Sequence, residues 1–262
     1  MADFHGTQEV VTDLREDGVL IMRINRPEKR NAINGVTSAT MEDIMNKAEK
    51  DKRVRVIVVT GTGEKAFCAG EDLSELSEGG ECQTVTEHGF GGITARLCSK
   101  PIIAACNGSA AGGGMEIALS CDMVVAAENA KFGCTEVGLG IIASTGGIVR
   151  LARDINRKDC MELLLTGKKI KAPQAKELGL INYVVPAEEV MDKAIELAEQ
   201  VLKNAPLALK WTKYLVHAAD QMSEEDAMRY CDGAYRFLEK TEDGIEGPLA
   251  FTEKRTPNWV GR

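Results

Sequence analysis

Short apolar segments separated by turn residues dominate the N-terminal half of the chain. Residues 8–25 hold two such segments around Asp17-Gly18, and they predict two strands that end at Arg26-Pro27, because proline lacks the donor that a strand ladder needs. Residues 54–60 and 101–106 are almost continuously apolar, which is typical of buried strands. Further strands are expected over 122–127 and 180–185. The pattern therefore predicts a buried sheet.

Apolar residues at helical spacing begin after Asn34-Gly35 and dominate the chain from about residue 200. Residues 77–92, with five glycines, predict a loop that leads into a helix ending near Cys98. Other helices are expected over 156–165, 172–178 and 187–203. The predicted apolar stripe of the first helix is Val36, Met41, Ile44 and Ala48. A later helix is expected to begin at Pro206, and its apolar stripe is predicted to pack in the core or in a subunit interface: Leu207, Trp211, Leu215 and Ala218. No linker rich in proline or serine intervenes, so we expect one α/β domain with a helical C-terminal extension.

A glycine triplet, Gly112 to Gly114, joins a predicted strand to a predicted helix over 115–120. Glycines let the backbone turn tightly and approach a ligand, and the free N–H groups of a first helical turn point at whatever lies beside them. Glu116 stands one turn into this helix. The arrangement predicts a site that stabilises a partial negative charge next to a side chain that carries a proton. The alternative is a packing turn in which Glu116 is a solvated acid favoured by the helix dipole.

A second junction of the same kind lies at 67–73, where small residues and a glycine precede an acidic helix start. Two such junctions suggest a repeated strand–turn–helix unit, with each bend aiming a backbone N–H at a shared pocket. Glu136 follows in a turn-rich stretch, and because a helix of about eight residues advances only ~12 Å, it can face the same site as Glu116. Spacing alone favours a surface carboxylate at Glu136. Residues 61–66 match a dinucleotide-binding turn only superficially, since no helix follows directly.

Composition excludes several classes of function. The chain has 262 residues, 44% of them hydrophobic, and a net charge of −8, which argues against a nucleic-acid partner. It has no apolar run of about 18 residues and no secretion pattern at its start, so we expect a cytoplasmic protein without a membrane segment. Eight scattered cysteines without a C-x-x-C pair, and three histidines (His5, His88 and His217), predict reduced core thiols rather than a zinc site or a Ser-His or Cys-His hydrolase.

Taken in order, these elements resemble the crotonase superfamily, the enoyl-CoA hydratases and isomerases, over nearly the whole chain. The segments that carry the resemblance are Arg26-Pro27, Asn31-Ala32-Ile33-Asn34, 67–73, Lys100-Pro101, Asn107-Gly108, 112–118, Ala130-Lys131-Phe132, Glu136, 138–140, Gly146-Gly147, Arg150-Leu151, Thr166-Gly167, Ala172, Ala175, Gly179-Leu180 and 246–255. The last of these is also similar to the tail of the carnitinyl-CoA dehydratases, which are crotonobetainyl-CoA hydratases.

The resemblance implies a spiral of repeated ββα units. Residues 1–200 would form this spiral core, which binds a CoA thioester and catalyses. Residues 201–262 would form a helical region that serves trimerisation and covers the pocket as a lid. The resemblance also implies a homotrimer or a dimer of trimers and a role in fatty acid metabolism.

The same resemblance assigns residues to the site. The thioester oxygen would lie between the backbone N–H groups of Glu71 and Gly113, where two donors stabilise the enolate-like charge that water addition creates. Glu116 would take a proton from the attacking water, and Glu136 would deliver one to the α-carbon. The remaining residues expected to bind the acyl-CoA are Ala69, Gly70, Asp72, Leu73, Gly112 and Ser144. No metal or redox cofactor is expected, because coenzyme A is part of the substrate.

Three features differ from the pattern of the family. Glu71 stands where many relatives have a small or apolar residue, which places a third acid near the pocket. Ala143-Ser144 replaces a frequent Pro-Gly, and Gly79 to Gly92, which helps to shape the acyl pocket in relatives, has no readable pattern. A double-bond isomerase, or a hydratase of a specialised acyl-CoA such as crotonobetainyl-CoA, stays open as an alternative. A non-catalytic CoA-binding or scaffold protein is the alternative from another class.

Overall fold

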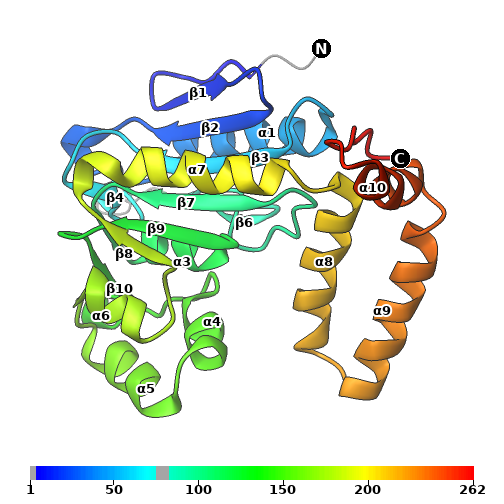
Figure 1. Cartoon of the computed structure of the whole chain (residues 1–262). Coiled ribbons are helices and arrows are strands. Elements are labelled where there is room, and N and C mark those ends of the chain that lie inside the picture. Colours follow the sequence, from blue (N-terminus) through cyan, green and yellow to red (C-terminus); the bar gives the residue numbers. More distant parts are fainter. Residues whose placement is uncertain (1–3, 75–82) are drawn as a thin grey trace. The chain divides into compact units, whose positions relative to one another are not determined.

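A six-stranded sheet lies at the core of the computed structural model, which describes residues 4–74 and 83–262. The strand order is β1-β2-β3-β7-β9-β12, and β1–β2 is the only antiparallel pair in this sheet (Figure 1). The strands are β1 (Val10–Leu14), β2 (Val19–Ile24), β3 (Val56–Gly61), β7 (Ile102–Cys106), β9 (Met123–Ala127) and β12 (Tyr183–Val185). Every residue of β3 and β7 is buried, as their continuous apolar runs predict.

A smaller sheet has the order β11-β10-β8-β4. Its strands are β4 (Ala66–Cys68), β8 (Ser109–Ala111), β10 (Lys131–Gly133) and β11 (Ile170–Lys171). The chain alternates between the two sheets, from β3 to β4, from β7 to β8 and from β9 to β10. Helix α3 (Gly113–Ser120) follows β8 and completes a ββα unit. This alternation confirms the fold class expected from the sequence. Strand β10 lies within a stretch predicted as turn-rich, and β8, just before the glycine triplet, had no strand predicted.

Helix α1 (Gly35–Lys50) begins where the Asn34 side chain accepts a hydrogen bond of 2.8 Å from the Thr37 amide. It buries Met41, Ile44 and Ala48, but Val36 is 58% exposed, so that member of the predicted stripe is wrong. Within the described residues, the other helices that begin before residue 200 are α4 (Gly147–Asp154), α5 (Arg157–Thr166), α6 (Ala172–Glu177) and α7 (Val190–Leu202). The 3-10 turns there are η1 (Pro27–Lys29), η2 (Glu136–Leu139) and η3 (Ala187–Glu189).

The helix expected to end near Cys98 is absent from the described residues 83–98, and the prediction is wrong there. Strands β5 (Val85–Thr86) and β6 (Gly89–Phe90) form a hairpin, and turns follow. Gly89, Gly91 and Gly92 all have positive φ, which a right-handed helix does not accommodate. Residues 77–82 of the predicted loop lie outside the described part of the chain.

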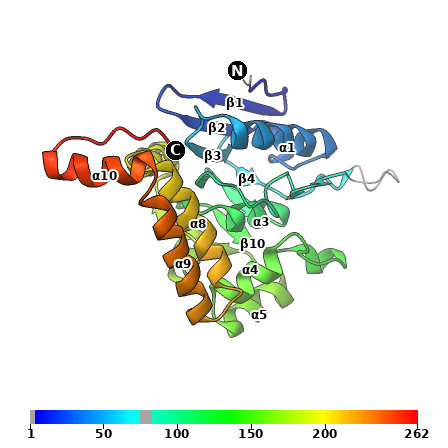
Figure 2. The ribbon, with the colours of Figure 1, turned by 90° about the vertical axis from the view of Figure 1, so that its right-hand side faces the viewer.

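The chain divides into two compact units, one of residues 1–96 and 102–198 and one of residues 97–101 and 199–262. The second unit contains α8 (Pro206–Ala219), α9 (Glu224–Leu238) and α10 (Glu242–Glu253). Helices α8 and α9 run side by side in both views (Figures 1 and 2), with Trp211 against Tyr214 and Phe237 at ring-centroid distances of 5.8 and 6.0 Å. No helix in the described part of the chain has the length and apolar character that crossing a membrane requires.

Replacing Gly114 with alanine should destabilise the fold. A Cβ at Gly114 would overlap the carbonyl oxygen of Cys68, because α3 packs with its backbone directly on β4. Overpacking of this kind costs about 1–3 kcal/mol of unfolding free energy. Gly233 in α9 is the matched control, since no atom lies within 4 Å of its added Cβ and alanine in a helix gains about 0.5–1 kcal/mol. Equilibrium urea unfolding measures both changes, and a Gly114→Ala protein as stable as the wild type would contradict this packing.

Candidate active site

The first glycine bend, residues 69–72, is fixed by a parallel β-bridge. The amide of Ile33 donates to the carbonyl of Gly70, and the amide of Asp72 donates to the carbonyl of Ile33, both at 2.8 Å. In a parallel bridge, the residue between these two groups directs its own N–H to the opposite side. The N–H of Glu71 therefore points away from Ile33.

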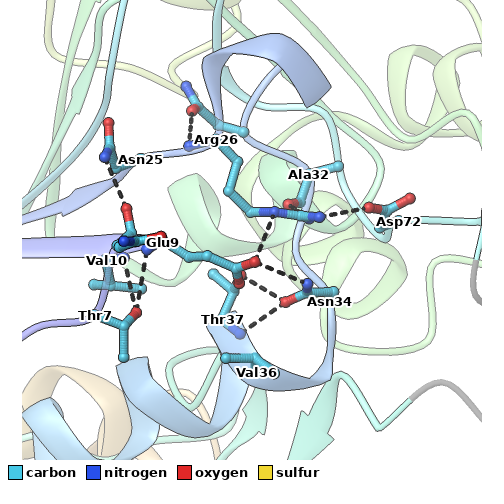
Figure 3. Close-up of polar contacts among 12 residues, drawn as sticks. Thr7, Glu9, Val10, Asn25, Arg26, Ala32, Asn34, Val36, Thr37 and Asp72 are labelled. Atoms are coloured by element: carbon cyan, nitrogen blue, oxygen red, sulfur yellow. Dashed lines mark hydrogen bonds and ion pairs between the residues drawn. The ribbon is translucent and has the colours of Figure 1, made fainter.

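A buried ion pair holds the end of this bend. The guanidinium of Arg26 lies between Glu9 and Asp72 (Figure 3), with Nη2 at 2.8 Å from Asp72 Oδ2 and Nε at 3.5 Å from Glu9 Oε1. Arg26 Nη1 also donates to the carbonyl of Ala32. The hydrogen bond from the Ser74 hydroxyl is the main cause that lowers the pKa of Asp72. Burial opposes this shift, and the hydrogen bond and charge of Arg26 lower the pKa further. Asp72, expected to bind the acyl-CoA, is thus engaged in positioning the bend.

The second glycine bend leads into α3 and touches the first. Gly112 has φ +55° and donates its amide to the carbonyl of Gly133, and Gly113 is the first residue of the helix, so its N–H points off the helix end. A Cβ on Gly70 would lie 3.2 Å from the amide nitrogen of Gly113 and 3.0 Å from the carbonyl oxygen of Ala111. Side chains larger than hydrogen would separate the two backbones.

A cavity of about 140 Å³ lies beside the two bends. Every site residue expected from the sequence lines it except Asp72: Ala69, Gly70, Glu71, Leu73, Gly112, Gly113, Glu116, Glu136 and Ser144. Sequence reasoning missed the other lining residues, which are Thr84, Val85, Phe90, Thr135, Leu139, Ile141, Ile142 and Thr145. Both glycine bends and both proposed catalytic acids therefore meet at one cavity.

Glu116 is buried, with 3% of its surface exposed, and both of its carboxylate oxygens accept hydrogen bonds. The amide of Gly147 donates to Oε1 at 2.8 Å, and the hydroxyl of Thr145 donates to Oε2. Gly147 is the first residue of α4, so the helix end favours negative charge on Glu116. The pair Gly146-Gly147 was the sequence signal for this donor, whereas nothing in the pattern distinguished Thr145.

Glu136 is half-buried at the start of η2 and has different surroundings. Its Oε2 is buried, and no partner for this atom exists among the residues that the structure describes. Burial raises the pKa of this carboxyl more than a hydrogen bond from its own backbone lowers it, and the charge of Glu116 adds a smaller upward contribution. A Cβ on Gly112 would lie 3.4 Å from Glu136 Oε1, so this acid stands directly over the second bend. Glu136 is therefore suited to carry a proton, while Glu116 accepts hydrogen bonds.

Glu71 adds a third carboxylate to the lining. Its Oε1 accepts a hydrogen bond of 2.6 Å from the hydroxyl of Thr84, which is 1% exposed. The Thr84 carbonyl in turn accepts from the Ser38 hydroxyl at 2.6 Å. The hairpin also contributes Phe90, whose ring would meet a Cβ on Gly113 at 2.5 Å. The side chain of Glu71 is thus held at the cavity by the segment that sequence reasoning could not interpret.

A second cavity, of about 490 Å³, shares Ala69 with the first. Three basic side chains line it, together with one acid and small or polar residues. The lining residues are Arg30, Glu64, Lys65, Ala66, Ala69, Ser109, Ala111, Asn129 and Lys169. This cavity therefore favours an anionic group next to the site of the two acids.

One group of possible metal ligands occurs among the described residues, in which ligand atoms of Glu42, Glu87 and His88 lie within 4.8 Å of one another. Both Glu42 oxygens already have partners there, since Arg96 and His88 contact Oε1 and the Thr86 hydroxyl donates to Oε2. Burial raises the pKa of Glu42, but these hydrogen bonds and the charge of Arg96 outweigh it and lower the pKa to about 2. These contacts join the β5–β6 hairpin to Glu42 of α1.

Known proteins are similar to this chain over nearly its full length. The family described as enoyl-CoA hydratase/isomerase matches residues 14–262. The carnitinyl-CoA dehydratase of Proteus mirabilis (strain HI4320) is 40% identical over 250 residues, which cover 93% of this chain and 95% of the relative. The enoyl-CoA hydratase structure from Mycobacterium tuberculosis H37Rv has a TM-score of 0.92 at 37% identity, and that of carnitinyl-CoA hydratase from Mycobacterium avium has 0.77 at 42%. Each covers 98% of this chain and 100% of the solved chain.

Glu136→Gln should stabilise the protein at neutral pH. The native state holds the Glu136 proton more tightly than the unfolded chain does, so stability falls as the pH rises above the ordinary glutamate pKa of 4.5. Glutamine keeps the shape and cannot ionise. Urea unfolding should therefore show a more stable variant at pH 7 and a smaller difference at pH 4.

The matched control is Glu116→Gln, which weakens two hydrogen bonds to a buried carboxylate and should cost about 1–3 kcal/mol. Equal destabilisation by both substitutions at pH 7 would contradict the different surroundings assigned to the two acids.

Proposed function

Because the chain belongs to the enoyl-CoA hydratase/isomerase family, we propose that the cavity is the active site of a hydratase. The enzyme adds water to a 2-enoyl-CoA thioester or removes it in the reverse direction. The observation that carries the proposal is the meeting of two glycine bends and two dissimilar glutamates at one cavity. Isomerisation of a double bond needs only a proton carrier, whereas hydration also needs a group that activates water.

The two bends would bind the thioester oxygen. Attack of water on the β-carbon pushes an electron pair through the double bond onto the carbonyl oxygen, which becomes enolate-like. The N–H groups of Glu71 and Gly113 are fixed before the substrate arrives, so they stabilise this charge without reorganisation. Loss of one such donor typically costs about 3 kcal/mol of transition-state stabilisation.

The two acids would divide the proton transfers. Glu116 takes the proton that the attacking water releases, and the new C–O bond forms at the β-carbon. Glu136 gives its proton to the α-carbon as the enolate collapses. The raised pKa of Glu136 supports this division, because the donor must be protonated when water adds. Neither step requires a metal or a redox cofactor.

The basic cavity would hold the coenzyme A part of the substrate. Arg30, Lys65 and Lys169 line it, and phosphate groups are the anions that such side chains bind best. Ala69 lines both cavities, so the basic cavity lies next to the cavity of the two bends. This adjacency supports an acyl-CoA thioester as substrate.

The other candidate functions differ in the acyl group that is used or in the reaction that is catalysed. Relatives at 40% identity are named carnitinyl-CoA dehydratases, which favours crotonobetainyl-CoA as a specialised substrate. A double-bond isomerase stays a second candidate, and a non-catalytic CoA-binding protein would bind thioesters without turnover.

A homotrimer or dimer of trimers stays part of the proposal. Large side chains exposed on α8, α9 and α10 support it, among them Val216, Met228, Tyr235 and Phe251. Sedimentation velocity measures this state. Four further points stay predictions from the sequence. They are a cytoplasmic location, a role in fatty acid metabolism, the absence of nucleic-acid and membrane partners, and the lid role of residues 201–262.

Mixing the protein with crotonyl-CoA should remove the conjugated-enoyl absorbance. Glu116→Gln and Glu136→Gln should each lower kcat by at least about a hundredfold, because each removes one proton transfer while keeping the shape of the side chain. Binding of a CoA ester, measured by calorimetry, should stay within a few-fold of the wild type. Hydration that survives both substitutions would overturn the mechanism.

Lys65→Ala and Lys169→Ala should each raise KM for crotonyl-CoA about three- to tenfold with little change in kcat. Each removes a cation from the coenzyme cavity and leaves the reacting atoms untouched. The effect should shrink as ionic strength rises. Lys158→Ala, at an exposed position of α5 that lines neither cavity, is the charge-matched control. Unchanged KM values in both variants would place the coenzyme elsewhere.

A further inference from the structure

The ionisable side chains known to line the catalytic cavity in the described part of the chain are all acids. Glu71, Glu116 and Glu136 line it, and no lysine, arginine or histidine occurs among its lining residues in the described part of the chain. An isolated carboxylate in such a place is costly unless a donor or a cation faces it. The cavity therefore disfavours an acyl group with a negative charge and favours one with a positive charge.

Two arginines near the site have partners of their own. Arg26 lies between Glu9 and Asp72 (Figure 3) and does not line the cavity. Arg150 donates to the carbonyl of Thr94 at 2.6 Å and does not line the cavity. Neither arginine makes an ion pair with Glu71, so the charge of this residue is available to a ligand.

Glu71 differs from the two acids assigned to proton transfer. Its Oε1 accepts a hydrogen bond from the buried hydroxyl of Thr84, and this contact fixes the carboxylate at the cavity wall. The same residue supplies the amide proposed to bind the thioester oxygen, and its side chain lines the same cavity. An acyl chain bound at the two bends therefore extends within the cavity that holds this carboxylate.

The walls next to Glu71 are apolar or aromatic. Leu73 and Val85 line the cavity beside it, and the ring of Phe90 covers Gly113. A carboxylate combined with apolar surface and an aromatic ring suits a quaternary ammonium, whose charge is surrounded by methyl groups. A primary ammonium would instead need hydrogen-bond acceptors to replace its water.

We propose that Glu71, held by Thr84, selects a 2-enoyl-CoA whose γ-carbon bears a quaternary ammonium. The inference rests on the proposed function and narrows its substrate class. Glu71 acts as a fixed counter-charge, and it takes no part in proton transfer. Affinity for the cation adds to the binding of the thioester at the two bends.

A charge series of 2-enoyl-CoA substrates, of which the cationic and neutral members have the same shape, tests the proposal. Crotonobetainyl-CoA carries the cation, 5,5-dimethylhex-2-enoyl-CoA replaces its nitrogen with carbon, and 4-carboxybut-2-enoyl-CoA carries an anion. We expect the wild type to have a kcat/KM at least tenfold higher for the cationic than for the neutral thioester, with the anionic thioester lowest. Raising the ionic strength should reduce the ratio.

Substitution of Glu71 separates the effect of its negative charge on substrate preference from any effect of its side chain on the structure of the site. Glu71→Gln should bring the cationic-to-neutral ratio close to one, whatever it does to the absolute rates, because glutamine keeps the shape and an acceptor for Thr84. Thr84→Val should lower the ratio partly. Glu16→Gln, at an exposed position between β1 and β2, changes the net charge equally and should leave the ratio unchanged.

Two results would overturn the inference alone: hydration of the neutral thioester with no preference for the cation, or an equal loss of kcat/KM for both substrates in Glu71→Gln. A wild type that hydrates none of the three thioesters would overturn the proposed function, and this inference with it.

Discussion

The contact between the two glycine bends is the constraint on which the site depends. Strands β4 and β8 pair in parallel, with Ala66 opposite Ser109 and Cys68 opposite Ala110, so both chains leave the small sheet at the same edge. Gly70 and Gly112 follow directly, and their positive φ values turn the two backbones toward each other. Two amides that are 42 positions apart in the sequence (Glu71 and Gly113) thereby reach one cavity. The repeated ββα unit is thus the source of a paired donor site.

The acids near this contact show how a site is kept reactive at a cost in stability. Glu116 is satisfied by two donors, whereas Glu136 keeps a buried oxygen that no described residue pairs. Unpaired buried polar atoms are rare in folded proteins because their desolvation is not compensated. In the proposed function this cost is offset by the use of Glu136 as the proton carrier. The buried Arg26–Asp72 pair gives the first bend the rigidity that such a site needs.

Much of the fold followed from the sequence because local signals agreed with it. The continuous apolar runs of β3 and β7 and the helical spacing that begins after Asn34-Gly35 each have one physical interpretation. Short strands such as β8 and β10 did not, since three residues carry too little periodicity and their pairing comes from the sheet. Spacing could not place Glu136 beside Glu116, and only the resemblance did so. Thr145 and Thr84 were missed because a hydroxyl donor to a distant carboxylate leaves no pattern in the chain.

The central claim is that the amides of Glu71 and Gly113 together bind the thioester oxygen. A crystal structure of the Glu136→Gln protein with a bound 2-enoyl-CoA measures this directly. The account predicts the carbonyl oxygen at about 2.7–3.1 Å from both amide nitrogens. An oxygen within hydrogen-bonding distance of only one of them, or of neither, would contradict it.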